Sequence, residues 1–165
     1  MKVLFSGGGT LGPVTPLLAI HDMIRSHYQD ASCVWIGTAS GPEQEFIQKK
    51  GIRFIPIASG KFRRYASVLN ILDIMRLIVG FFEALGVLVR EKPNVCISAG
   101  GFVSVPVHAA AWCLGIPTWI HQQDVIVGMA NRIMAPFART ITTALEETSS
   151  HFQKQKTIWL GNPVR

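Results

Sequence analysis

Short apolar runs alternate with longer helical patterns along the whole chain of 165 residues. The runs are rich in Val, Ile, Phe and Trp, and Gly, Pro or Asn bounds them. Near-continuous apolar strands that alternate with helices predict a parallel sheet covered on both faces. With right-handed crossovers, this is an α/β, Rossmann-like sheet of about seven strands. We expect strands at 2–6, 33–38, 53–57, 94–98, 118–121, 140–143 and 157–160, and helices near 14–27, 42–50, 67–90, 103–114 and 126–135.

The length suits one domain with a sizeable core, which we place at residues 1–160. Gly161-Asn162-Pro163-Val164-Arg165 breaks structure directly after the last expected strand. We therefore expect residues 161–165 to begin an interdomain linker, with a C-terminal domain absent from the sequence.

The composition points to an anionic partner. The chain has a net charge of +6, with 48% hydrophobic and only 16% charged residues. Positive charge of this kind suits nucleic acid, a phosphate-rich ligand or a membrane surface. Cys33, Cys96 and Cys113 are odd in number and widely spaced, which argues against a disulfide framework or a zinc site. Reduced thiols in the cytoplasm are the better interpretation.

The first glycine-rich loop, Ser6–Pro16, lies between an expected strand and an expected helix. Gly7, Gly9 and Gly12 satisfy G-x-G-x-x-G, but the second strand ends at Thr38 where a dinucleotide site needs an acid. No G-K-[ST] follows, which excludes a P-loop. Glycines still allow close backbone approach, and free N–H groups at a helix N-terminus attract phosphate oxygens. The alternative is a tight turn that binds nothing.

Two further loops follow expected strands, and ligands of such folds bind outside the carboxyl ends of strands. Ser98–Pro106 repeats the glycine pattern, so the two glycine loops together could hold one diphosphate between two helix N-termini. The third loop concentrates polar groups and offers a general base in His121 or Asp124. The alternatives are a core histidine and a helix-capping aspartate.

These three loops, closed by GNPVR, resemble the MurG family of glycosyltransferases in glycosyltransferase family 28. The resemblance covers essentially the whole chain but only the N-terminal half of such an enzyme, whose GT-B fold has two Rossmann-like domains. It rests on Gly8-Gly9-Thr10, Gly12, Pro16, Gly100 to Ser104, Pro106, Ala111-Trp112, Leu114 to Pro117, His121, Gln123, Gly128, Asn131 and Gly161 to Arg165.

The resemblance implies an acceptor-binding half of an N-acetylglucosaminyltransferase of peptidoglycan synthesis. The acceptor is lipid-linked muramyl-pentapeptide (lipid I to lipid II), and UDP-GlcNAc binds only with the missing C-terminal domain. We expect this chain alone to be inactive, with no cofactor and no metal. We expect the acceptor pyrophosphate at Gly8, Gly9, Thr10, Gly12, Gly100, Gly101, Phe102 and Ser104, and the acceptor/donor cleft at Gln123, Asn131, Asn162 and Arg165.

The sequence departs from the family pattern at two loops. The family's first loop reads GGTGGH, whereas Leu11 replaces a glycine here and Pro13 replaces the histidine that is a candidate to bind or deprotonate the acceptor. The family's His-Glu-Gln-Asn becomes His121-Gln122-Gln123-Asp124. We hypothesise that Asp124 or His121 activates the acceptor. The alternative function is a non-catalytic module that binds lipid pyrophosphate or anchors a donor-binding partner to the membrane.

The expected helix 67–90 has more apolar surface than one buried stripe requires. Polar residues at 70, 73, 76, 83 and 90 fit one stripe, and charges argue against a membrane span. A peripheral position on the inner face of the bacterial membrane follows from the resemblance, and cations beside apolar surface suit anionic lipids. Burial of the helix is the alternative. No nucleic-acid partner is expected, because the basic residues are few and no recognised module is present. The expected membrane residues are Lys61, Phe62, Arg63, Arg64, Leu77, Phe81 and Phe82.

Overall fold

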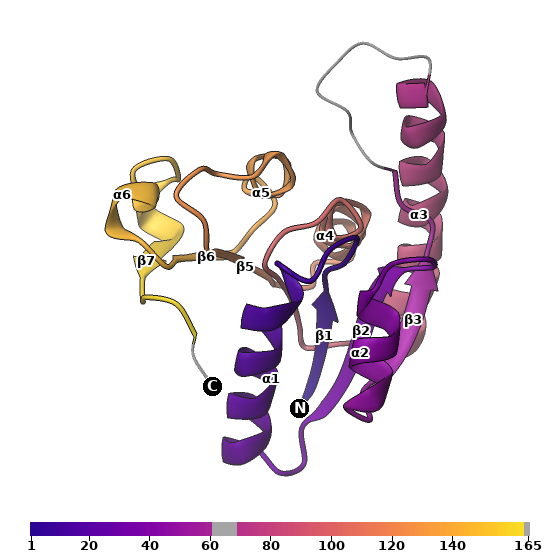
Figure 1. Ribbon diagram of the computed structural model, residues 1–165, viewed down its shortest axis with the longest axis horizontal. Helices are drawn as coiled ribbons and strands as arrows, with labels where there is room; N and C mark the ends of the chain where they lie inside the picture. Colours follow the sequence, from indigo (N-terminus) through magenta and orange to yellow (C-terminus); the bar gives the residue numbers. More distant parts are fainter. Residues whose placement is uncertain (61–68, 164–165) are drawn as a thin grey trace.

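The computed structural model describes residues 1–60 and 69–163, with the backbone alone for 69–71. Seven parallel strands form one sheet in the order β3-β2-β1-β4-β5-β6-β7. Figure 1 shows β3 and β7 at opposite ends of the molecule. The strands are β1 (Lys2–Ser6), β2 (Ser32–Thr38), β3 (Arg53–Ile57), β4 (Val95–Ser98), β5 (Thr118–Gln122), β6 (Thr140–Thr143) and β7 (Thr157–Trp159).

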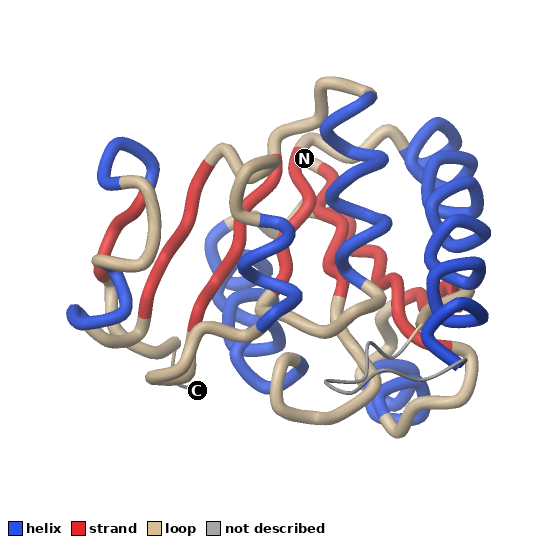
Figure 2. The backbone as a smooth tube through the Cα atoms, turned by 90° about the horizontal axis from the view of Figure 1, so that it is seen from above, coloured by secondary structure: helices blue, strands red, loops and turns tan. Residues whose placement is uncertain are grey.

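Helices cover both faces of the sheet, as the view from above shows (Figure 2). One core packs α1 and α2 against β1 and β2, and a second packs α3 and α4 against the other face of the same strands. Adjacent strand residues point to opposite faces, so Phe5 and Trp35 belong to the first core while Leu4 and Ile36 belong to the second. The helices are α1 (Val14–His27), α2 (Glu43–Lys49), α3 (Leu69–Glu91), α4 (Ser104–Cys113), α5 (Met129–Met134) and α6 (Glu146–Ser149), with a 3₁₀ turn, η1 (Lys154–Lys156).

The predicted fold class and element order are confirmed. All seven expected strands are present, and their bounds differ from expectation by at most one residue. The helix expected at 126–135 is shorter, because Gly128 is still extended (φ −62°, ψ 145°) and α5 begins after it. Helix α6 and η1 were not expected, since neither is long enough to show a helical period.

Strand order reverses between β1 and β4, and this reversal places the candidate site. The chain builds outward from β1 through β2 to β3, and then returns to add β4 on the other side of β1. Such a switch point leaves a crevice outside the carboxyl ends of the two central strands. The loops after β1 and β4, which are the two glycine loops, therefore lie next to one another.

Candidate active site

The two glycine loops touch backbone to backbone. A Cβ built on Gly101 would lie 2.8 Å from the carbonyl oxygen of Gly8 and 3.2 Å from its nitrogen. Gly101 also has φ +88°, a region that L side chains rarely adopt. Ser104 ties the loops together, because its hydroxyl donates to the carbonyl oxygens of Ser6 (2.9 Å) and Gly100 (3.0 Å). Residues predicted from the glycine pattern are thus brought together.

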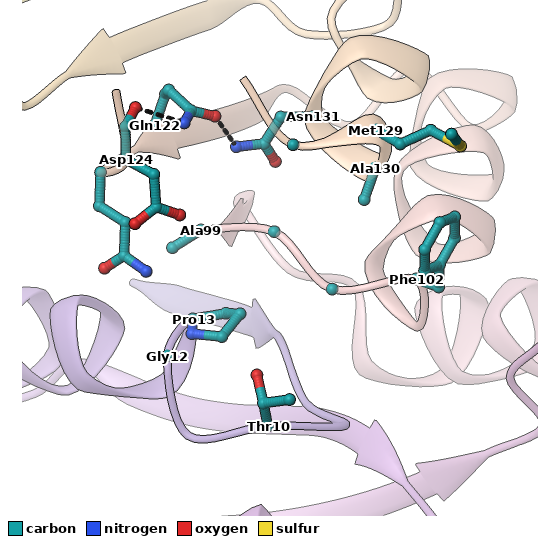
Figure 3. A pocket seen from close by; sticks show the side chains of 14 residues that line it. Thr10, Gly12, Pro13, Ala99, Phe102, Gln122, Asp124, Met129, Ala130 and Asn131 are labelled. Atoms are coloured by element: carbon teal, nitrogen blue, oxygen red, sulfur yellow. Dashed lines mark hydrogen bonds between the residues drawn. The ribbon is translucent and has the colours of Figure 1, made fainter. Parts of the chain in front are cut away.

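Two cavities flank the first glycine loop. The first, which we call the Asp124 cavity, has a volume of about 330 Å³ and opens between the first, second and third loops (Figure 3). The second, which we call the Ser59 cavity, has a volume of about 560 Å³ and opens toward the loops after β2 and β3. Thr10, Pro13, Gly101 and Phe102 line both cavities and so form their shared wall.

A hydrogen-bonded set of side chains forms one wall of the Asp124 cavity. Gln122 donates through Nε2 to the carbonyl oxygens of Asp124 (2.8 Å) and Ile126 (3.3 Å). Asn131 donates through Nδ2 to Gln122 Oε1 (2.7 Å). Figure 3 shows Asp124 and Asn131 on the side of the cavity that faces Pro13 and Thr10. The predicted Gln123, Asp124 and Asn131 therefore share one cavity with Gly12, Gly100 and Gly101.

Backbone and hydroxyl groups line the Ser59 cavity. The hydroxyl-bearing residues Thr38, Ser40 and Ser59 line it together with Gly8, Gly9 and Thr10. Behind this wall lies the buried carboxylate of Glu43, which accepts from the backbone N–H (2.8 Å) and the hydroxyl of Thr38. A Cβ on Gly8 would overlap that carboxylate, so any side chain at position 8 would force Glu43 to move.

His121 lies apart from Asp124, although only two residues separate them. His121 and Gln122 are adjacent on β5 and point to opposite faces of the sheet. The His121 ring lines a different hollow of about 200 Å³, with Ile20, Trp119 and Leu160 among its neighbours. The predicted cleft residue Asn162 lines this hollow rather than the Asp124 cavity. The third loop therefore does not form one site.

Hydrogen bonds determine the tautomer of His121. Trp119 Nε1, which only donates, is 2.8 Å from Thr142 Oγ1. Asn162 Oδ1 lies 3.4 Å from His121 Nε2 and can only accept, so this contact favours the proton on Nε2, and Nδ1 then accepts from the Thr142 hydroxyl at 2.9 Å. Burial lowers the pKa of His121, and the Asn162 contact raises it less. The His121 ring is therefore neutral: Nε2 donates, and the lone pair of Nδ1 accepts from Thr142.

Other predicted residues have more limited support. Ser104 is fully buried, and its hydroxyl is used by the two carbonyls described above. Arg165 and the basic cluster Lys61, Phe62, Arg63 and Arg64 lie outside the described residues. Reasoning from sequence missed Thr38, Ser40, Ser59 and Glu43. The rule that ligands bind at the carboxyl ends of strands would have found the first three, since Thr38 ends β2 and Ser40 and Ser59 follow β2 and β3.

Helix α3 presents apolar side chains to solvent. Phe82 is 63% exposed and Met75 is 58% exposed, whereas Leu77 and Phe81 are half-buried. The expectation of surplus apolar surface is confirmed. Part of the polar stripe packs inward instead: Asp73 is buried, whereas Glu83 is exposed and accepts from the Ala58 N–H at 2.6 Å. Within the described residues, no helix has the length and apolar character that a bilayer crossing requires.

The sequence matches a family model over most of its length. Residues 3–143 match the glycosyltransferase family 28 N-terminal domain. The chain is 45% identical over 164 residues to UDP-N-acetylglucosamine–N-acetylmuramyl-(pentapeptide) pyrophosphoryl-undecaprenol N-acetylglucosamine transferase of Shouchella clausii, covering 99% of the chain and 46% of that protein. It is 41% identical over 166 residues to the protein of the same name from Staphylococcus carnosus, covering 99% of the chain and 45% of the relative. The chain thus spans about half the length of these relatives.

Solved structures share the fold. MurG of Acinetobacter baumannii superposes with a TM-score of 0.82 at 24% identity, over 99% of this chain and 46% of that one. UDP-GlcNAc 2-epimerase of Neisseria meningitidis, solved with UDP-GlcNAc, gives 0.72 at 15% identity, over 98% of this chain and 46% of that one. The second likeness shows that one fold serves two chemistries, so the family assignment rests on the sequence matches. On those matches, the chain belongs to glycosyltransferase family 28 and corresponds to the N-terminal half of its MurG members.

Proposed function

We propose that this chain is the acceptor-binding half of an inverting N-acetylglucosaminyltransferase that acts on lipid-linked muramyl-pentapeptide pyrophosphate. The observation that carries the proposal is the direct contact of two glycine loops at the switch point, with a cavity on either side of the first loop. The names of the relatives supply the substrates: UDP-N-acetylglucosamine and a muramyl-pentapeptide on undecaprenyl pyrophosphate. UDP-N-acetylglucosamine would bind mainly to a second domain, with residues 161–163 leading toward it.

The chemistry of the two cavity walls supports separate places for the acceptor's sugar and diphosphate. The Asp124 cavity carries a carboxylate, which would repel phosphate oxygens and accept from a sugar hydroxyl. The Ser59 cavity is lined by hydroxyls and glycine backbone and by no acidic side chain among the described residues. Lys61 directly follows Gly60, a residue that lines this cavity, in the sequence. The diphosphate would therefore lie on the Ser59 side of Thr10, with the sugar on the Asp124 side.

Asp124 is the better candidate for the general base. Displacement at the sugar carbon requires removal of a proton from the attacking acceptor hydroxyl. The Asp124 carboxylate lines the cavity opposite Pro13, the position at which the family has a histidine. His121 lies in the other hollow, with Nδ1 occupied and Nε2 protonated. Because a base needs a free lone pair directed at the substrate, His121 does not qualify in this arrangement.

The exposed face of α3 supports peripheral membrane contact. Leu72, Met75, Ile78, Val79 and Phe82 expose about half or more of their surface. Exposed apolar surface of this extent marks an interaction site, and the sequence-adjacent cations Arg63 and Arg64 suit anionic headgroups. Since the acceptor carries a polyprenol chain, contact with the inner face of the bacterial membrane would bring the site to its substrate.

Paired binding measurements test the proposal. The chain is titrated with lipid-linked muramyl pyrophosphate in vesicles, and separately with UDP-N-acetylglucosamine. We expect saturable acceptor binding that Gly101→Ala abolishes, and no donor binding at concentrations that saturate complete relatives. Donor binding without acceptor binding would overturn the assignment, because the glycine loops would then serve a nucleotide.

The second candidate function is a non-catalytic module that binds lipid pyrophosphate or anchors a donor-binding partner. Pro13 favours it, because proline neither donates a proton nor accepts one at the family's histidine position. Joining the chain to the donor-binding half of the Shouchella clausii relative separates the two functions. Transfer by the joined protein supports the enzyme, whereas acceptor binding without transfer supports the module.

A further inference from the structure

Gln122 connects the functional groups of the Asp124 cavity. It is the last residue of β5, and only 1% of its surface is exposed. Its side-chain amide contacts two backbone carbonyls of the third loop at one end and the Asn131 side chain at the other. We infer that Gln122 is a positioning residue, which holds Asp124 in place and decides which atom Asn131 presents to the acceptor. We call the three side-chain contacts of Gln122 the clamp. The choice of ligand rests on the proposed function, whereas the clamp itself does not.

The backbone determines the orientation of both amides. The carbonyl oxygens of Asp124 and Ile126 can only accept, so the Gln122 NH₂ group must face them. Gln122 Oε1 then faces Asn131, whose NH₂ group must donate to it. The Asn131 NH₂ group also lies 3.5 Å from the His121 carbonyl oxygen, which reinforces the same orientation. Flipping either amide would place oxygen against oxygen.

The orientation of the two amides leaves Asn131 Oδ1 as a hydrogen-bond acceptor beside the cavity. Asn131 is 3% exposed, and its Oδ1 has no hydrogen-bond partner among the described residues. A Cβ on Gly100 would lie 3.6 Å from that oxygen, so it is directed at the second glycine loop, which lines the same cavity. Buried oxygens without partners are rare and costly. Together with the Asp124 carboxylate, Asn131 Oδ1 suits a ligand group that donates, such as a sugar hydroxyl or an acetamide N–H, and not a phosphate oxygen.

The family has glutamate at position 122 and asparagine at position 124, whereas this chain has Gln122 with Asp124, so the contacts described here depend on the amide of this chain. A glutamate of the same shape would have no proton to donate to the two carbonyls, and its charge would lie buried beside their oxygens. The loop would then lose both contacts that hold Asp124. Burial raises the pKa of a carboxyl group, so such a glutamate would regain a proton under mildly acidic conditions. A protonated carboxyl can donate to one carbonyl and accept from Asn131, which partly restores the clamp.

The test compares Gln122→Glu with the wild-type chain between pH 8 and pH 5. At pH 8 we expect 15N relaxation to show order parameters at 124–127 falling from about 0.85 toward 0.6 or below. Acceptor affinity, measured with lipid-linked muramyl pyrophosphate in vesicles, should fall at least tenfold. Both quantities should return toward wild-type values as the pH approaches 5. Among the described residues that line the cavity, Asp124 is the one other acid, and its titration is common to both proteins.

Gln123→Glu is the matched control. Gln123 lines the same cavity, and its side chain makes no hydrogen bond to the third loop among the described residues. This variant adds the same charge next to the clamp, so the order of 124–127 should stay at the wild-type level. Wild-type order parameters in Gln122→Glu at pH 8, or loop disorder that does not recover at lower pH, would overturn the inference.

A third variant covers a failure of Gln122→Glu to fold. Asn131→Ala removes one end of the clamp and leaves the carbonyl contacts, so affinity should fall while 124–127 stay ordered. Unchanged affinity would contradict the role given to Asn131. If the wild-type chain binds no acceptor, the proposed function fails, yet the NMR comparison still decides whether Gln122 positions the loop.

Discussion

Gly101 approaches Gly8 so closely that a Cβ on Gly101 would lie 2.8 Å from the Gly8 carbonyl oxygen. The loops after β1 and β4 are 93 positions apart in the sequence, yet they form one surface with a cavity on each side. The close approach depends on the missing side chain and on the positive φ of Gly101. The contact between these two glycines is therefore the part of the site most sensitive to substitution.

Gly101→Ala should cost about 3 kcal/mol of unfolding free energy, from left-handed backbone strain and overlap with Gly8. Urea unfolding measures the stability, and acceptor titration should show lost binding. Gly86→Ala in α3 is the control, because nothing lies within 4 Å of its added Cβ. That variant should be neutral or more stable by up to about 1 kcal/mol. Equal stability of the two variants would contradict the close approach.

His108 makes the stability of the fold sensitive to acid. It is fully buried in α4, neither ring nitrogen has a hydrogen-bond partner in the part of the chain that the structure describes, and burial lowers its pKa from 6.5 to about 3. The unfolded chain therefore binds a proton below pH 6.5 that the folded chain does not. Stability from this group is complete above pH 6.5 and is lost as the pH falls, by about 2 kcal/mol at pH 5.

The variant His108→Met should remove most of this pH dependence. Urea unfolding at pH 7.5 and at pH 5 gives the comparison, and the variant should be at least as stable as wild type at pH 7.5. Part of the slope will remain, because burial also lowers the pKa of His121. An unchanged slope in the variant would show that His108 is not the group responsible.

Asp124 and His121 should differ in their effect on transfer by the chain joined to a relative's donor-binding half. Asp124→Asn removes the proposed base and should lower kcat by about 10² to 10⁴-fold, with acceptor affinity largely kept. His121→Ala should keep more activity, since the ring is a donor in a separate hollow. If His121→Ala were the more damaging of the two, or if both variants kept full transfer, the role given to Asp124 would be wrong.

Phe82→Ser should weaken sedimentation with anionic vesicles about tenfold, because Phe82 is 63% exposed on the apolar face of α3. Phe46→Ser is the matched control: Phe46 is 44% exposed but belongs to α2, on the other face of the sheet. Arg63→Glu with Arg64→Glu should weaken binding most at low salt. Binding that none of these changes alters would exclude membrane contact through this face.

The sequence alone determined the order of elements and the location of both glycine loops. Apolar runs, helical periods, and glycine and proline turns are all local patterns that neighbouring residues define. The bounds of β1 to β7 could therefore be predicted to within one residue. The roles of Gly101 and Asp124 as neighbours could also be predicted, because parallel strands end at one edge. Family resemblance then suggested the acceptor that we propose.

Tertiary structure decided which side chains share a cavity. His121 and Asp124 looked equivalent in the sequence, but the pleat of β5 and the helices against each face send His121 to another hollow. The polar stripe of α3 gave the same difficulty: Asp73 is buried because the Ala58–Gly60 segment packs beside it, and apolar side chains of the helix remain exposed. Both outcomes depend on which distant element covers a given face. That packing is non-local, and a local sequence pattern does not contain it.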